Sequence, residues 1–256
     1  HDIDFCVIKF PEIPKPMGDI DILIPDQEGV NEAFRDAGYL LEDETTPHRR
    51  DFVKIFEEKK IVIDIHTAVA WSRVKYVPSG AVFKEHVDRT VTVGEYSVSV
   101  PVPCPEHDLL ITAAHALFDN NAVNLFEVLY GVHLMTKSDF DRSAASSLAA
   151  SQNWRDALHY YFCLLDRTQQ AIRGDAVVSV VAEFPVVLPL GRVLRFRANK
   201  LSRDLDDGSR RAAAIETLGY AQDLFFYIFG QRLGLPIEYI LLSVKFGRKA
   251  LRHLRK

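Results

Sequence analysis

The stretch Gly18-Asp19-Ile20-Asp21-Ile22-Leu23-Ile24 decides how the first part of the chain is interpreted. It alternates polar and apolar residues and stops before Pro25, which predicts a β-strand over residues 19–24. Residues two apart in a strand point to the same face, so Asp19 and Asp21 are expected side by side. Two carboxylates held this close repel each other, and Mg²⁺ or Mn²⁺ relieves that repulsion. On spacing alone, an edge strand with a solvated polar face is the alternative.

A third aspartate strengthens the metal interpretation. Asp64 lies inside Ile61-Val-Ile-Asp-Ile-His66, a second apolar strand pattern. A carboxylate in such a strand is costly to bury unless it is paired or bound to metal. If this strand lies beside the strand of Asp19 and Asp21, three carboxylates converge, as they do around the two metals of phosphoryl-transfer sites.

Short β-like runs and one helical stretch make up the rest of the first hundred residues. Further strands are expected at 4–10 and 52–56, a helix at 26–38 that ends at Gly38, and a hairpin at 90–100 that turns at Gly94-Glu95. From Glu106 onward, apolar residues recur at helical spacing. The expected class is therefore α+β: a small mixed β-sheet domain (residues 1–103) followed by a helical domain (residues 104–256).

Composition limits the environment and the general partners. The 256 residues carry a net charge of -4, which gives no overall attraction to nucleic acid or membrane. The three cysteines, Cys6, Cys104 and Cys163, are far apart and fit reduced thiols. There is no apolar run long enough to span a membrane and no signal-peptide pattern, so a cytoplasmic protein is expected.

Three basic positions and one histidine are candidates for the surroundings of the carboxylates. Lys9 ends the first strand and could contact phosphate, and Arg49 and Arg50, after His48, could form a phosphate-binding lip. Solvent-exposed positions are the alternative for all of them. His66 shares the face of Asp64 and is either a partner of the site or a core histidine.

Two features of the helical half were also considered. Glu106, His107 and His115 lack the spacing of a helical metal motif, and Glu106 suits the start of a helix instead. The C-terminal helical pattern ends in a basic run that could contact an anionic membrane surface or nucleic acid, with a solvated helix end as the alternative. The basic residues are Lys245, Arg248, Lys249, Arg252, Arg255 and Lys256.

An ordered set of motifs resembles the uncharacterised nucleotidyltransferase family of the DNA polymerase β-like superfamily over roughly residues 4–165. The motifs are Lys9, Gly18–Ile24, Ala33-Phe-Arg-Asp-Ala-Gly-Tyr39, Ile63-Asp-Ile-His66 with Trp71, and Pro105-Glu-His-Asp-Leu-Leu-Ile-Thr-Ala-Ala-His115.

The resemblance implies a two-metal transfer of a nucleoside monophosphate from an NTP to a hydroxyl acceptor, with release of pyrophosphate. It implies that Asp19 and Asp21 bind both metals and that Gly18 lets the backbone approach the nucleotide. Asp64 would bind the catalytic metal and help to deprotonate the acceptor.

The sequence departs from the superfamily pattern before the first aspartate. A Gly-Ser or Gly-Gly pair followed by a helix normally binds the triphosphate there. This chain has Lys9-Phe10 and a proline-rich link instead. The alternative function is therefore a catalytically inactive module that keeps the fold and binds a partner or ligand. A nucleotide-sugar glycosyltransferase with an Asp-x-Asp motif is disfavoured, because fewer than twenty residues precede the motif.

Overall fold

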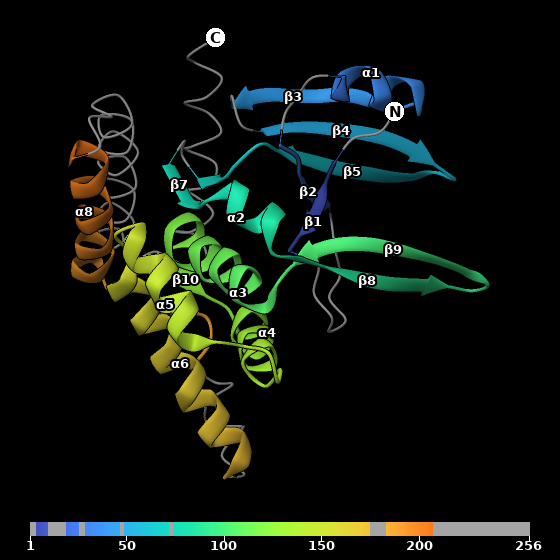
Figure 1. Ribbon diagram of the computed structural model, residues 1–256. Coiled ribbons are helices and arrows are strands. Elements are labelled where there is room, and N and C mark those ends of the chain that lie inside the picture. Colours follow the sequence, from blue (N-terminus) through green and yellow to red (C-terminus); the bar gives the residue numbers. More distant parts are fainter. Residues whose placement is uncertain are drawn as a thin grey trace.

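The computed structural model describes residues 4–9, 19–25, 29–46, 49–71, 74–174 and 183–206 (Figure 1). Strands dominate the first hundred residues and helices dominate the later ones, so the expected α+β class is confirmed. Gly18, His48 and the basic C-terminal segment lie outside the described residues. Within the described part, no helix is long and apolar enough to cross a membrane.

A five-stranded mixed sheet forms the centre of the first half. Its strands are β1 (Cys6–Ile8), β2 (Ile20–Leu23), β3 (Leu40–Thr46), β4 (Arg49–Phe56) and β5 (Lys59–His66). Their order across the sheet is β1-β2-β5-β4-β3. β2 and β5 run parallel, and the other neighbouring pairs run antiparallel. The two strands that carry the predicted site are therefore direct neighbours.

Helix α1 (Val30–Asp36) covers one face of this sheet. Val30 and Phe34 pack with Phe52, Ile63 and Ile65 in a small apolar core. Gly38 ends the helical turn with φ of 81°, a left-handed conformation that glycine adopts without strain, as the sequence predicted. Because alternate residues of a strand face opposite sides, Asp21 and Asp64 point to the face that α1 does not cover.

Short elements connect the sheet to the helices. They are β6 (Val69–Trp71), β7 (Val74–Val77), α2 (Ser79–Lys84), β8 (His86–Val93) and β9 (Tyr96–Pro103). β8 and β9 form the predicted hairpin, which is longer than expected at both ends and turns at Gly94, where φ is 60°. In Figure 1 this hairpin projects away from the helices, below the central sheet.

The second half contains helices and one small sheet. The helices are α3 (Pro105–Ala114), the π-helix η1 (His115–Asn120), α4 (Leu125–Met135), α5 (Arg142–Ser151), α6 (Arg155–Arg173) and α8 (Leu190–Asp206). The expectation of an all-helical region needs one correction, because β10 (Ala122–Val123) and β11 (Val186–Val187) pair as a two-stranded sheet. Strands this short leave no alternating pattern in the sequence.

The main hydrophobic core crosses the predicted boundary at residue 103. Ile8 and Leu23 of the sheet belong to the same buried cluster as Phe118 and Trp154 of the helical half. The Trp154 Nε1–H donates to the backbone oxygen of Tyr76 over 3.1 Å. The strands of the first half end at Pro103 and α3 begins at Pro105, but the division into two domains stays a prediction.

Candidate metal and nucleotide site

A row of carboxylates crosses three adjacent strands of the central sheet. Asp21 of β2 is paired with Asp64 of β5, and Asp64 is paired with Asp51 of β4. Paired residues on neighbouring strands present their side chains on the same face. Asp21 and Asp64 are 5% and 2% exposed, whereas Asp19, just before β2, is exposed. The adjacency that the three-carboxylate hypothesis required is present.

Two basic side chains neutralise the buried carboxylates. The Lys9 Nζ lies 2.9 Å from Asp21 Oδ1, and the Arg49 Nη2 lies 2.5 Å from Asp64 Oδ2. Arg49 also donates to both oxygens of Asp51, from Nε at 2.8 Å and from Nη2 at 3.1 Å. The side chains of Lys9 and Arg49 are 28% and 40% exposed, so both pair with a buried carboxylate while remaining partly in contact with solvent.

His66 is a neutral partner of the site. Burial lowers the pKa of His66, and this effect outweighs the opposite influence of Asp21. Its Nε2 lies 2.8 Å from Asp21 Oδ1. Because the ionised carboxylate can only accept, the neutral ring donates from Nε2 and orients Asp21. His66 is thus a buried histidine whose hydrogen-bond partner is a predicted site carboxylate, which fits both sequence interpretations.

The two buried aspartates have opposite pKa shifts. Burial acts to raise the pKa of Asp21, but the charge of Lys9 and the hydrogen bond from His66 outweigh burial and hold it well below its usual range. Burial raises the pKa of Asp64 to about 7, assisted by the charges of Asp51, Asp21 and Asp19 and only partly opposed by Arg49. Of the two buried aspartates, Asp64 is therefore the one whose charged form is disfavoured, chiefly by burial.

The donor set fits a hard divalent cation. Asp64 Oδ1 is buried and has no hydrogen-bond partner among the residues that the structure describes. One ligand atom each from Asp21, Asp64 and His66 lies within 4.8 Å of the others. Carboxylate oxygens are the ligands that Mg²⁺ and Mn²⁺ prefer, and a cation would supply Oδ1 with the partner it lacks.

The structure separates the two predicted arginines. Arg49 reaches the carboxylates, but Arg50 faces the opposite side of β4, where its Nη1 donates to Asn31 Oδ1 over 3.0 Å. Asp51 was missed by the sequence analysis, because the strand was expected to begin at Phe52. Arg49, Arg50 and Asp51 are all charged, so no alternation in the sequence marks this part of the strand.

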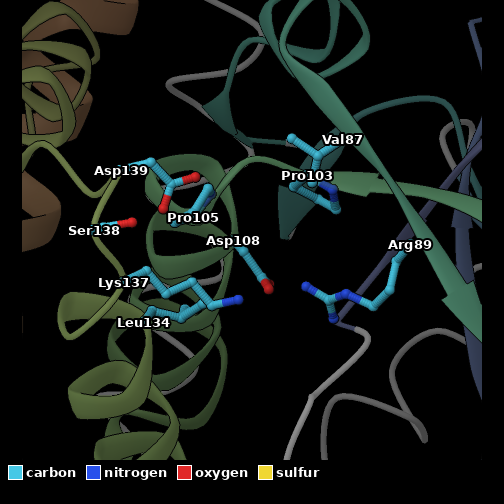
Figure 2. A pocket seen from close by; sticks show the side chains of 9 residues that line it. All are labelled: Val87, Arg89, Pro103, Pro105, Asp108, Leu134, Lys137, Ser138 and Asp139. Carbon is cyan, nitrogen blue, oxygen red and sulfur yellow. The ribbon is translucent and has the colours of Figure 1, made fainter.

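A separate pocket of about 340 Å³ lies between the β8–β9 hairpin and helices α3 and α4. Figure 2 shows Arg89 extending toward Asp108 from the hairpin side, with Lys137 on the helical side. The pocket is also lined by Val87, Pro103, Pro105, Leu134, Ser138 and Asp139. None of the predicted site residues lines this pocket.

The central sheet presents acidic side chains on two neighbouring parallel strands. The family model described as "Uncharacterised nucleotidyltransferase" matches residues 15–169, and the chain belongs to this family. The match includes Asp19, Asp21, Asp51 and Asp64. A search of curated proteins and a search of solved structures gave no match.

Proposed function

We propose that this protein transfers a nucleoside monophosphate from an NTP to a hydroxyl acceptor and releases pyrophosphate. The observation that carries the proposal is the pairing of Asp21 and Asp64 on adjacent parallel strands, with a buried Asp64 oxygen that lacks a partner among the described residues. Membership of a nucleotidyltransferase family supports the same reaction class.

Asp19, Asp21 and Asp64 would hold the divalent cations. When bound, Mg²⁺ or Mn²⁺ supplies Lewis-acid activation of the attacking hydroxyl and stabilises charge on the leaving pyrophosphate. His66 keeps Asp21 oriented through its 2.8 Å hydrogen bond. Ionised Asp64, whose pKa lies near neutrality in the metal-free protein, can accept the proton of the acceptor hydroxyl.

Lys9 and Arg49 would exchange partners during the reaction. In the structure they form ion pairs with Asp21 and Asp64. A cation at Asp21 Oδ1 would compete with the Lys9 ammonium for the same oxygen, and a cation at Asp64 Oδ1 would repel the Arg49 guanidinium bound to Oδ2. The two partly exposed side chains are then released toward the solvent side, where they can contact the triphosphate. This exchange would replace the glycine-rich anion site that the sequence lacks.

The test is transfer of label from each of the four α-labelled NTPs, in Mg²⁺ or Mn²⁺, to protein, RNA and small hydroxyl compounds. Asp21→Asn and Asp64→Asn should reduce transfer by at least about 100-fold, because each removes charge that the reaction needs. Asp88→Asn, an exposed position on the β8–β9 hairpin, is the control and should retain activity. Full activity of Asp21→Asn would rule out the proposed mechanism.

The same two ion pairs also favour a second candidate, a non-catalytic binding module. The side chains of Lys9 and Arg49 already neutralise Asp21 and Asp64, so these carboxylates do not need a metal for that purpose. Under this alternative, no NTP and no divalent cation displaces Lys9 or Arg49. Chemical shifts of the Arg49 Nε–H measured with and without Mg²⁺ distinguish the two, since only the nucleotidyltransferase predicts a metal-dependent change.

Contact of the basic C-terminal segment with an anionic surface stays a prediction, because residues 207–256 lie outside the described part of the chain. Deletion of residues 247–256 should reduce sedimentation with anionic liposomes if the segment binds membrane. Equal sedimentation of the two forms would exclude that role.

A further inference from the structure

A second group of ligand-type side chains lies at the base of the β8–β9 hairpin. Glu85 directly follows α2 and precedes β8, and Cys104 lies between β9 and α3. His107 is in the first turn of α3. The hairpin register pairs His86 with Pro103, so the fold brings Glu85 next to Cys104 although they are far apart in sequence. Figure 1 shows this place, where α2 leads into β8 and β9 leads into α3.

The three side chains are within ligand distance of one another. One atom each from Glu85, Cys104 and His107 lies within 4.8 Å of the others. The Cys104 Sγ is 3.3 Å from His107 Nδ1, and the Glu85 Oε2 is 3.8 Å from His107 Nε2. Donor atoms bound to one tetrahedral metal at about 2.0 to 2.3 Å are separated by roughly 3.3 to 3.8 Å. One metal ion binds a single nitrogen of an imidazole, so only the Glu85 Oε2–His107 Nε2 spacing is compared with this range, and it falls within it. Cys104 Sγ contacts the other ring nitrogen and belongs to the group through the 4.8 Å limit that all three ligand atoms satisfy.

His107 supplies an independent indication of a missing ligand. Its side chain is fully buried, and its Nε2 has no hydrogen-bond partner among the described residues. The 3.8 Å separation from Glu85 is too long for a hydrogen bond. A buried ring nitrogen that faces a carboxylate without bonding to it is unfavourable, and a cation between the two groups would satisfy both.

We propose that Glu85, Cys104 and His107 bind one transition-metal ion of the zinc class. Nitrogen, sulfur and carboxylate oxygen are the ligand types of zinc, whereas Mg²⁺ prefers oxygen alone. Binding would convert the Cys104 thiol to a thiolate and release its proton to solvent, with His107 bound as neutral imidazole. Three protein ligands leave a fourth position for water or another ligand.

This metal is distinct from the cations proposed at the central sheet. It would link the end of α2 to the start of α3 and so close the base of the hairpin. The sequence does not predict this site, because along one helix His107 has only Glu106 and His115 as ligand-type neighbours, without metal spacing. The ligand set instead comes from three positions that only the folded hairpin brings together.

Cobalt binding tests the proposal with a readout other than activity. The full-length protein is stripped with a chelator, dialysed and titrated with Co²⁺, and the thiolate-to-cobalt absorption is recorded together with the stoichiometry. We expect one Co²⁺ per chain with a thiolate band, and displacement of Co²⁺ by added Zn²⁺. Absence of a thiolate band in the folded wild-type protein would overturn the proposal.

The variants locate the site. Cys104→Ser should abolish the thiolate band and keep the fold, because serine is favourable at the N-cap position that Cys104 occupies before α3. Glu85→Gln changes an exposed side chain and should weaken Co²⁺ binding at least about tenfold. Circular dichroism confirms the folding of each variant. Co²⁺ affinities of both variants equal to that of the wild type would contradict the assignment.

A second cysteine–histidine pair provides the matched control. Cys163 and His159 lie one turn apart on α6, both exposed, with Sγ 3.8 Å from Nε2. Cys163→Ser combined with His159→Gln should leave the band unchanged. Loss of the band in this double variant, and its persistence in Cys104→Ser, would show that the metal binds at the surface of α6 instead. Asp21→Asn should also keep the band, which separates this proposal from the proposed function.

Discussion

Replacement of Arg49 by methionine tests whether Asp64 binds a divalent cation. Methionine keeps most of the length of the side chain and removes its charge, so Asp64 and Asp51 lose their common partner. Removal of one partner from a fully buried ion pair costs about 3 to 5 kcal/mol. Because the Arg49 side chain is 40% exposed, solvent screens part of this effect, and we expect a loss of about 2 kcal/mol.

Magnesium should reverse this loss. The assay is urea unfolding of wild type and Arg49→Met at pH 8, where Asp64 is mostly ionised in the wild-type protein, with and without Mg²⁺. A ligand that binds only the folded state at 100 times its Kd stabilises by about 2.7 kcal/mol. In the variant, Mg²⁺ does not compete with the guanidinium. With Mg²⁺ present, the difference in free energy of unfolding between the variant and the wild-type protein should therefore fall to less than about 1 kcal/mol.

Arg50→Met is the matched control, because Arg50 follows Arg49 directly and faces the other side of β4. Its free energy of unfolding should fall by about 1 kcal/mol, because the hydrogen bond to Asn31 is removed, and this loss should not depend on Mg²⁺. If Arg49→Met and Arg50→Met lose equal stability and Mg²⁺ affects neither difference, the reasoning about Asp64 is refuted.

Three further predictions follow from the same structure. In calorimetry, the Mg²⁺ affinity should rise about tenfold per pH unit between pH 5 and 7 and level off above pH 7. The reason is that Asp64 has a raised pKa of about 7 and must lose its proton to bind metal. An affinity that does not change with pH would exclude Asp64 as a ligand. Gly131→Ala should destabilise by about 1 to 3 kcal/mol in thermal unfolding, since an added Cβ would lie 2.9 Å from the Tyr161 hydroxyl, whereas Gly191→Ala, with open space around it, should not destabilise. Asn124→Ala should cost about 1 kcal/mol in urea unfolding by removing the capping box of α4, and an unchanged midpoint would count against that cap.

The faces of the central sheet could be predicted from the sequence, because strand alternation depends only on local spacing. Asp21 and Asp64 are separated from Ile22 and Ile63 by this rule, and the structure agrees. The turn at Gly94 and the end of α1 at Gly38 were also predictable, since both positions have the left-handed backbone that glycine favours.

Contacts between segments far apart in the sequence could not be predicted in the same way. Arg49 and Arg50 are equivalent as neighbouring cations in the sequence, and only the register of β4 assigns one to the carboxylates and the other to α1. Asp51 was missed because the charged start of β4 has no apolar alternation on the site face. The approach of Glu85 to His107 depends on closure of the hairpin, which sequence spacing does not encode.

Calorimetric titration of each NTP with Mg²⁺ or Mn²⁺ is the most direct test of the central claim that the carboxylate face is a metal and nucleotide site. The wild-type protein is compared with the Asp19→Asn/Asp21→Asn double variant. We predict metal-dependent binding of at least one NTP by the wild-type protein and its loss in the folded double variant. Failure of the folded wild-type protein to bind any NTP, or equal binding by the variant, would contradict the account and favour the non-catalytic module.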